Sequence, residues 1–552
     1  MPDALNGISL LATPQSQAAD PRQVKNSAGG FTFTVDEMQR LRRFLVLGTD
    51  GGTYYIGERE LTQQNASFLF DLARRRGVEV VDEIVAISDA GRAPKNNQAL
   101  FALAAVTAVG DETARKAAYT ALPKVARIGT HLFQFVRYSQ QLRGWSRGLR
   151  RAVGNWYIER TPEQAAFQIA KYGSREGWTH RDVLRQAHPK PPTPQHDAVF
   201  KWAVSGVERA GLVPEIIKGV DLAKLSTDPA ETARLVRQYG LTWEMLPTEH
   251  LNDRKVWEAL LESNKVGITA LIRQLPRLTN IGLLGDSRFR TQVIDILTSK
   301  DALRKGRVHP INVLVALRTY GSGRSVKGSG TWTPVSQVVD ALDTAFYAAF
   351  ETVVPSGTRH LIALDVSGSM GSPVNGLPLN AREASVAMAM VTVATESDVQ
   401  VVGFTGGAGQ WGNSYAYSAY RSSFGADRGV DNLTVLDISA RRRLDDNVRA
   451  VTNLPFGGTD CALPMLYALE KGLEFDSFSV FTDSETWAGS VHPHEALRRY
   501  RKESGINAKL VVAGMSSTEF TIADPTDPGM LDVVGLDGSV PTLISDFFRG
   551  DV

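Results

Sequence analysis

The chain has 552 residues, which are too many for one hydrophobic core, so we expect two to four domains. Of these residues 43% are hydrophobic and 22% are charged, which is the composition of a soluble globular protein. Its 61 Lys and Arg nearly balance its 59 Asp and Glu, so a nucleic-acid surface would require local segregation of charge. The single cysteine, Cys461, excludes an internal disulfide and a cysteine-rich zinc site. The sequence shows neither a membrane-spanning apolar run nor a secretory signal. We therefore expect a cytoplasmic protein without a membrane segment.

Residues 1–30 are rich in Ser, Ala, Gln, Asn and Gly, and we predict a flexible leader. Residues 31–354 carry the apolar spacing of many short amphipathic helices, separated by Gly, Pro or acidic residues. Examples are 35–47, 66–76, 78–90, 97–109, 113–122 and 267–275. Close turns between short helices favour stacked helix pairs, an α-solenoid, over a large irregular helical domain, although no repeat of fixed period is found.

Positive charge is concentrated between Leu122 and Lys190. This window holds 13 Lys and Arg against four acids, an excess of nine positive charges on a nearly neutral chain. His131, His180 and several Trp and Tyr residues lie in the same window. Arginine can bind phosphate and stack on bases, and aromatic rings can hold unstacked bases. We therefore predict an RNA-binding region, the alternative being a solvated helix face with core aromatics.

Residues 171–190 contain the densest part of this window. Thr179 and Asp182 predict a capping-box start for a helix that Pro189 ends. Arg185 and His188 share one face of that helix with Arg181. The alternative for His188 is a C-terminal helix cap. A helix pair with cations at its turn is a plausible clamp for an RNA backbone.

After residue 355 strands alternate with helices, which predicts a doubly wound parallel sheet. The expected strands are 359–365, 399–404, 477–481 and 508–512. The expected helices are 381–394, 445–453, 460–471 and 494–502. Residues 406–443 are rich in Gly, Ser and Tyr and predict a surface insertion.

Asp365, Ser367 and Ser369 follow a buried strand, at the edge where open α/β sheets place their sites. Oxygen ligands of this kind suit Mg²⁺ best, with Mn²⁺ or Ca²⁺ as alternatives. The triplet alone could equally cap a helix. Thr459 and Asp483 are expected at the same edge, and they complete the set. The five residues in this order resemble the metal-ion-dependent adhesion site (MIDAS) of von Willebrand factor A (vWA) domains, in which the hydroxyls and carboxylates hold a divalent cation.

From about Gly30 onward the chain resembles the Ro autoantigen family, through stretches such as 51–56, 127–133, 177–180, 457–461 and 520–525. This resemblance implies a TROVE module at 31–354, built as a ring-like α-solenoid of HEAT-like repeats, and a vWA domain at 355–552 that joins the ends of the ring. It also implies binding of small noncoding Y RNA on an outer basic surface and of single-stranded ends of misfolded RNA in the central hole. Lys171, Arg175 and His188 align with family residues implicated in RNA contact. The full set of candidate RNA-binding residues is Arg127, Thr130, His131, Arg137, Lys171, Arg175, His180, Arg185, His188 and Lys190.

Three functions compete. The first, which we favour, is a non-catalytic, monomeric RNA-binding scaffold in RNA quality control, associated in bacterial family members with an exoribonuclease. The second is a metal-dependent protein-adhesion or chelatase-accessory module. The third is a metal-dependent hydrolase, which the sequence disfavours because it offers ligands for one cation and no evident catalytic base. The insertion at 406–443 departs from the family pattern and puts partner contacts beside the metal in doubt.

Overall fold

The computed structural model describes residues 13–48, 58–93, 95–206, 211–326, 328–350, 354–374, 379–406, 432–452, 454, 457–536 and 539–551. Up to residue 350 these residues are mainly helical. The helices are α2 (Glu37–Leu47), α3 (Glu58–Ala90), α4 (Asn97–Val109), α5 (Glu112–Val125), α6 (Gly129–Leu142), α7 (Arg147–Ile158), α8 (Pro162–Lys171), α9 (His180–Ala187), α10 (Pro194–Ser205), α11 (Glu215–Leu225), α12 (Pro229–Tyr239), α13 (Arg254–Glu262), α14 (Ile268–Asn280), α15 (Ser287–Thr298), α16 (Lys300–Lys305), α17 (Pro310–Gly321) and α18 (Ser336–Ala348).

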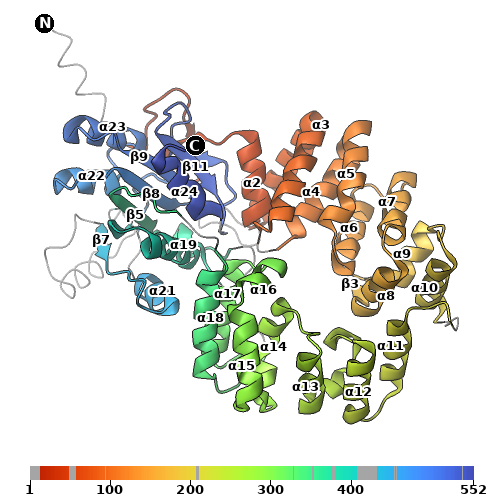
Figure 1. Cartoon of the computed structure of the whole chain (residues 1–552). Helices are drawn as coiled ribbons and strands as arrows, with labels where there is room; N and C mark the ends of the chain where they lie inside the picture. The colour runs from red at the N-terminus through yellow and green to blue at the C-terminus, as the bar shows by residue number, and fades with distance from the viewer. Residues whose placement is uncertain are drawn as a thin grey trace, which may run out of the picture.

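These helices follow one another round an arc (Figure 1) that begins and ends against the second half of the chain. The arc also closes on itself, because the end of α3 meets the segment before α17. Arg307 Nη2 lies 2.9 Å from Asp89 Oδ1, and His309 Nε2 lies 3.2 Å from the carbonyl oxygen of Arg92. The predicted ring of helical repeats is confirmed.

The second half contains a six-stranded sheet in the order β11-β9-β8-β5-β6-β7. Its strands are β5 (His360–Asp365), β6 (Val399–Phe404), β7 (Leu433–Leu436), β8 (Ser477–Thr482), β9 (Lys509–Gly514) and β11 (Met530–Val534). Its helices are α19 (Ala381–Thr395), α21 (Leu444–Thr452), α22 (Leu463–Glu470), α23 (Pro493–Ser504) and α24 (Ser539–Arg549). All neighbouring strands are parallel except β7, which pairs antiparallel with β6. The predicted doubly wound sheet is confirmed, with this antiparallel edge as a correction.

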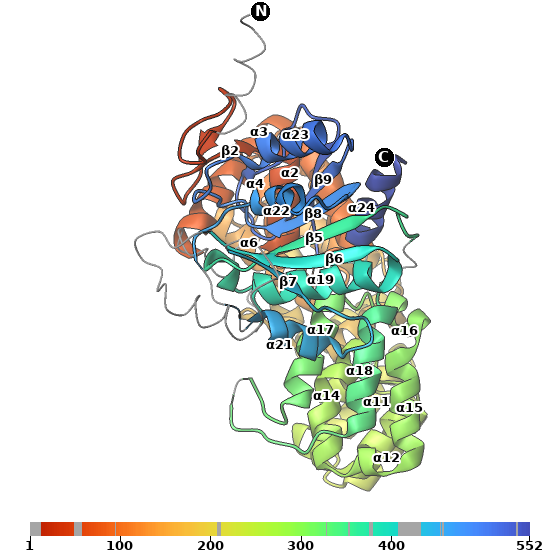
Figure 2. The ribbon, with the colours of Figure 1, turned by 90° about the vertical axis from the view of Figure 1, so that its left-hand side faces the viewer.

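Alternate residues of each strand face opposite sides of the sheet, as strand geometry requires. Leu361 and Ala363 of β5 pack in a core with α22 and α23, whereas Ile362 and Leu364 belong to the core that also holds α19 and α24. Figure 2 shows α22 and α23 on one side of the sheet and α19 on the other. The second of these cores continues without a break into the apolar interior of the helical ring.

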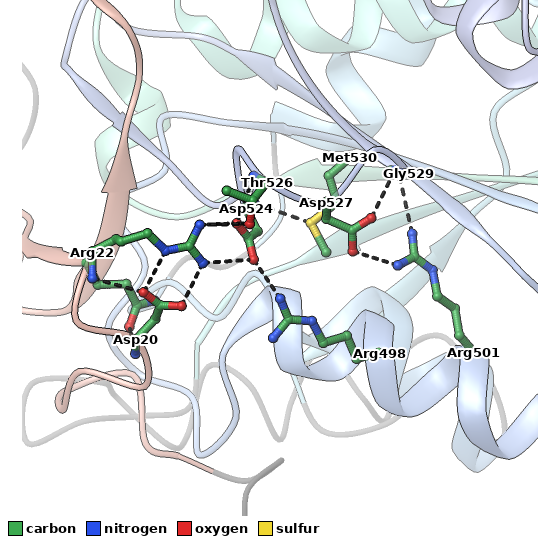
Figure 3. A network of polar contacts seen from close by, with 10 residues as sticks. Asp20, Arg22, Arg498, Arg501, Asp524, Thr526, Asp527, Gly529 and Met530 are labelled. Atoms are coloured by element: carbon green, nitrogen blue, oxygen red, sulfur yellow. Dashed lines mark hydrogen bonds and ion pairs between the residues drawn. The ribbon is translucent and has the colours of Figure 1, made fainter.

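The prediction of a flexible leader at 1–30 is corrected for residues 13–30, whereas residues 1–12 lie outside the described residues. Residues 13–30 lie against the vWA-like half, and β2 (Phe31–Thr34) pairs antiparallel with both β1 (Val24–Lys25) and β10 (Phe520–Thr521). Arg22 bridges Asp20 and the buried Asp524, which also binds Arg498 (Figure 3). Tertiary hydrogen bonds and ion pairs, instead of an apolar pattern, hold this polar segment, so its composition gave no sign of order.

Candidate metal centre and RNA-binding surface

The DxSxS triplet forms a buried loop at the carboxyl end of β5. Asp365 is fully buried, and its Oδ1 accepts a hydrogen bond from the backbone N–H of Ser367 (2.8 Å). Its Oδ2 accepts from the hydroxyl of Thr482, the last residue of the neighbouring strand β8 (2.6 Å). The hydroxyl oxygens of Ser367 and Ser369 lie 3.0 Å apart. The backbone therefore fixes three oxygen-bearing side chains around one point.

Thr459 and Asp483 approach this edge from two further loops. Asp483 directly follows β8, which is the parallel neighbour of β5. The loop that precedes α22 is held beside the end of β6, because the Thr405 hydroxyl donates to the carbonyl oxygen of Gly458 (2.9 Å). Thr459 and Asp483 are both buried, at 0% and 3% exposure. These contacts fit the predicted grouping of all five candidate ligands at one sheet edge.

The chemistry of these buried oxygens fits a divalent cation. Within the described ranges, Thr459 Oγ1 and Asp483 Oδ2 have no hydrogen-bond partner, and buried polar atoms in that state require an explanation. Burial and the charge of Asp365 raise the pKa of Asp483 to about 7, and burial raises the pKa of Asp365. Two carboxylates and three hydroxyls are hard ligands of the type that Mg²⁺ prefers. Among the described residues no group of three or more His, Cys, Asp or Glu could hold a metal, and the candidate centre itself offers two such residues beside its three hydroxyls.

Several residues around the centre were missed by sequence reasoning. Arg382 of α19 donates to the carbonyl oxygens of Val366 and Ser367 (2.9 Å each) and so fastens the triplet loop. Glu485 is fully buried, and burial and Asp483 raise its pKa to about 8. Gln15 donates to Asp460 Oδ1 (2.8 Å), beside Thr459. The nearness of Glu485 to Asp483 in sequence was a usable signal, whereas the contacts of Gln15 span more than 400 residues.

The predicted cationic helix is α9, whose start is the predicted capping box of Thr179 and Asp182. His188 follows the helix in a left-handed conformation (φ 46°), so it is the C-cap that the alternative interpretation expected. Arg181, Arg185, His188 and Lys190 are exposed, and their side chains make no ion pair with any residue that the structure describes. α7, which packs on α9, exposes three more arginines. We call the following residues the cationic surface: Arg147, Arg150, Arg151, Arg181, Arg185, His188 and Lys190.

Three other predicted cations are near this surface but carry acidic partners. Lys171 Nζ, at the end of α8, lies 3.5 Å from Glu244 Oε1. Arg175, in the two-residue strand β3 (Ser174–Arg175), lies 3.5 Å from Glu176, which also pairs with Arg137 of α6. β3 pairs with β4 (Trp178–Thr179) and contacts α6. The structure thus brings Arg137 and Arg175 together around one carboxylate.

One of the predicted RNA-binding residues, His180, is corrected, and two others, His131 and Arg127, are half-buried. His180 is 3% exposed, and its Nδ1 lies 2.7 Å from the Tyr157 hydroxyl. It packs against core aromatics, and burial lowers its pKa to about 3. Burial likewise lowers the pKa of His131 to about 4. Arg127 is half-buried and donates to Ser88 Oγ and to the carbonyl oxygen of Lys124 (3.0 Å each). His180 is therefore a core residue, whereas His131 keeps part of its surface exposed.

Other predictions fall partly outside the described residues. Thr130 is half-buried in the first turn of α6. Most of the predicted insertion, residues 407–431, lies outside the described residues, and its described end contains β7. Among the described helices, none combines the length and the apolar character needed to cross a membrane.

Comparison with known proteins identifies relatives over the whole length. The Ro60 vWA domain pattern matches residues 359–548, and the TROVE domain pattern matches residues 24–211 and 232–319. The chain is 40% identical over 559 residues to the RNA-binding protein RO60 of Deinococcus radiodurans, with 100% of both chains covered. It is 34% identical over 617 residues to the RNA-binding protein RO60 of Caenorhabditis elegans, covering 98% of this chain and 92% of that one. The crystal structure of the Deinococcus radiodurans RO (RSR) protein superposes with a TM-score of 0.67 and 39% identity, over 94% of this chain and 100% of the other.

Proposed function

Because the chain belongs to the Ro family, we propose that it is an RNA-binding protein whose helical ring holds RNA on the cationic surface. The observation that carries this proposal is the set of exposed cations on α9 and its C-terminal flank, which lack acidic partners among the described residues. Arg181, Arg185 and Lys190 are free to neutralise phosphates, and binding of this kind releases counterions and weakens with salt. Relatives at 40% and 34% identity carry the name RNA-binding protein.

The proposed ligands are small noncoding Y-type RNAs on the outer surface and single-stranded ends of misfolded RNAs in the ring. The cationic surface supports the first ligand, since stem-loop RNA offers closely spaced phosphates. The ring architecture supports the second. We propose a monomeric cytoplasmic scaffold that leaves RNA hydrolysis to a partner such as an exoribonuclease. The candidate metal centre supplies ligands for one cation, whereas two-metal phosphoryl chemistry needs a second site.

The RNA proposal is tested by changing Arg181, Arg185 and Lys190 together to Gln. Affinity for a structured small RNA, measured by fluorescence anisotropy, is expected to fall about tenfold or more, and the slope of log K against log salt to shrink by about one for each phosphate that is no longer neutralised. The control removes three exposed cations elsewhere, namely Arg288, Arg304 and Lys305. Equal affinity of the two triple variants would refute the assigned surface.

We also propose that Asp365, Ser367, Ser369, Thr459 and Asp483 hold a divalent cation, for which Mg²⁺ is the first choice on chemical grounds. When bound, the cation would offset the buried carboxylate charges and satisfy the unpartnered Thr459 and Asp483 oxygens. A ligand that binds only the folded state raises the melting temperature. We expect Mg²⁺ to raise it relative to EDTA in the wild type and in Asp446→Ala, an exposed control on α21, but not in Asp365→Ala. A shift that persists in Asp365→Ala would place the cation elsewhere.

The second candidate function is adhesion of a partner protein at this centre. The unpartnered oxygens of Thr459 and Asp483 favour it, because a cation held there could take a further ligand from a partner. Loss of partner capture in Asp365→Ala with RNA affinity intact would separate the two functions. Loss of RNA affinity in the same variant would instead mean that both functions depend on one folded unit.

A further inference from the structure

A cavity of about 430 Å³ lies where α8, α10 and α11 meet the short 3-10 helix Trp243–Met245. The three helices stand next to one another in the ring (Figure 1). Its walls are largely apolar, formed by Ile169, Ala170, Trp202, Val220, Met245 and Leu246. The exposed side chains of Lys224 and Glu249 are also part of its lining, so it opens to solvent. This volume falls in the range of small-molecule sites.

Glu244 places a carboxylate side chain in the lining of this cavity. Its Oε1 lies 3.5 Å from Lys171 Nζ, whereas its Oε2 is buried and has no hydrogen-bond partner among the described residues. The side chain of Glu244 is 21% exposed and lines the cavity. A carboxylate accepts hydrogen bonds and donates none, so the cavity favours a ligand that donates N–H groups.

The lining of the cavity adjoins two predicted RNA-binding residues along the chain. Lys171 is the last residue of α8, directly after the lining residues Ile169 and Ala170. Gly173 also lines the cavity, and the exposed Arg175 follows two residues later. A phosphate near Lys171 and Arg175 would leave the attached base within reach of the cavity. Trp202 offers an aromatic wall, and its indole N–H is already used by Asp221 (2.9 Å).

We propose that this cavity receives one unpaired nucleobase that carries an exocyclic amino group, with guanine preferred. The inference rests on the proposed RNA-binding function and deepens it. A carboxylate accepts hydrogen bonds and donates none, and guanine presents two adjacent donors, N1–H and the N2 amino group. Adenine and cytosine present one amino group beside an acceptor. Uracil places a carbonyl on each side of its single N–H and is repelled.

The experiment compares two labelled single-stranded octamers, oligo-U and oligo-U with one central G, by fluorescence anisotropy on the full chain. Wild type is expected to bind the G-containing octamer at least about fivefold more tightly, the lower bound for one bidentate base contact. Glu244→Gln removes the charged acceptor at nearly constant volume and is expected to abolish the preference. Its affinity for oligo-U should stay equal or rise slightly, since a negative charge is lost. Glu215→Gln, an exposed residue of α11 outside the cavity, is the matched control and should keep the preference.

A second variant, Ala170→Phe, fills the cavity and should lose the G preference while retaining oligo-U affinity. The melting temperature of Ala170→Phe reports whether this variant folds. If it does not fold, the result for Glu244→Gln alone tests the inference. A full preference in Glu244→Gln, or none in the wild type, overturns the inference. Binding of a structured small RNA but of neither octamer also overturns the inference and leaves the proposed function standing. Binding of none of the three RNAs overturns the proposed function and the inference with it.

Discussion

Burial decides which basic side chains between residues 122 and 190 can meet RNA. The helix start at Thr179 fixes the phase of α9, so that His180 falls on the same face as Val183, Leu184 and Ala187, all of them buried. Arg181 and Arg185 fall on the opposite, exposed face. The apolar spacing after His180 was visible in the sequence and could have placed its ring in the core.

The buried neutral state of His180 predicts a pH-dependent stability. Its pKa is lowered to about 3 by burial, so the unfolded chain binds a proton below about pH 6.5 that the folded chain does not. The wild type therefore loses about 2 kcal/mol at this residue between pH 7.5 and pH 5. His180→Asn lacks this loss, so its deficit in unfolding free energy should be about 2 kcal/mol smaller at pH 5 than at pH 7.5.

Urea denaturation of both proteins at the two pH values measures this difference, because other titrating groups contribute equally to both. RNA affinity at pH 7.5 is the control and should be unchanged wherever the variant is folded. A deficit that is the same at both pH values would show that His180 is protonated in the folded protein.

At the scale of elements, the N-terminal segment, residues 13–34, holds loops of the vWA domain in place. Gln15 is fully buried and donates to Asp460 Oδ1 and to the carbonyl oxygen of Val491 (2.8 Å each). Asn26 donates to the carbonyl oxygen of Thr486 (2.8 Å). These bonds fasten the loops before α22 and after β8, which carry two candidate metal ligands.

Removal of residues 1–34 should therefore loosen the metal centre. Loss of the three hydrogen bonds named above, at about 1 kcal/mol each, corresponds to a fall in melting temperature of at least about 3 °C for a chain of 552 residues. Hydrogen exchange should accelerate most in residues 457–492. A truncation of residues 1–12 leaves every contact named above in place and serves as the control. Unchanged hydrogen exchange in residues 457–492 after the longer truncation would show that the N-terminal segment does not hold these loops.

Elements with local signals could be predicted, and elements made by tertiary contact could not. The predicted helix 97–109 is α4, and the predicted strands at 359–365 and 399–404 are β5 and β6. The predicted end of a helix at Leu275 is wrong, because α14 continues through Pro276 to Asn280, where burial of Leu278 offsets the lost hydrogen bond. β2 was missed because its partner β10 lies almost 490 residues away.

The same distinction between local signals and tertiary contacts applies to the residues of the metal centre. The five candidate ligands follow from strand ends and their order along the chain. Arg382 and Gln15, which hold the loops in place, carry no local pattern that could distinguish them from surface residues.

For the whole molecule, one buried guanidinium contributes three hydrogen bonds to the contact between α2 and the vWA domain. Arg43 is 1% exposed and donates to the carbonyl oxygens of Thr518 (2.9 Å) and Phe520 (2.7 Å) and to Asp532 Oδ1 (2.6 Å). Its removal would leave the mostly buried carboxylate of Asp532 without its charged partner, with Gln39 Nε2 as a remaining neutral donor (3.0 Å), and would take one donor from each of the two carbonyl groups.

Arg43→Met should therefore destabilise the protein by about 3–5 kcal/mol, the cost of breaking a buried ion pair. Arg42→Met is a matched control on the neighbouring residue, whose partly exposed pair with Glu83 should contribute about 1 kcal/mol or less. Denaturant midpoints of the two variants measure the difference. Similar denaturation midpoints would show that the bonds of Arg43 between α2 and the vWA domain contribute little to stability.

The apolar interior that runs from the helical ring into one face of the sheet has a consequence for ancestry. Ile362 and Leu364 of β5 share that interior with α2 and α18. Each half taken alone would therefore expose apolar side chains to water. A vWA domain moved onto another scaffold by recombination would expose this face unless its residues changed at the same time. The two halves of this chain are therefore expected to be inherited as a pair.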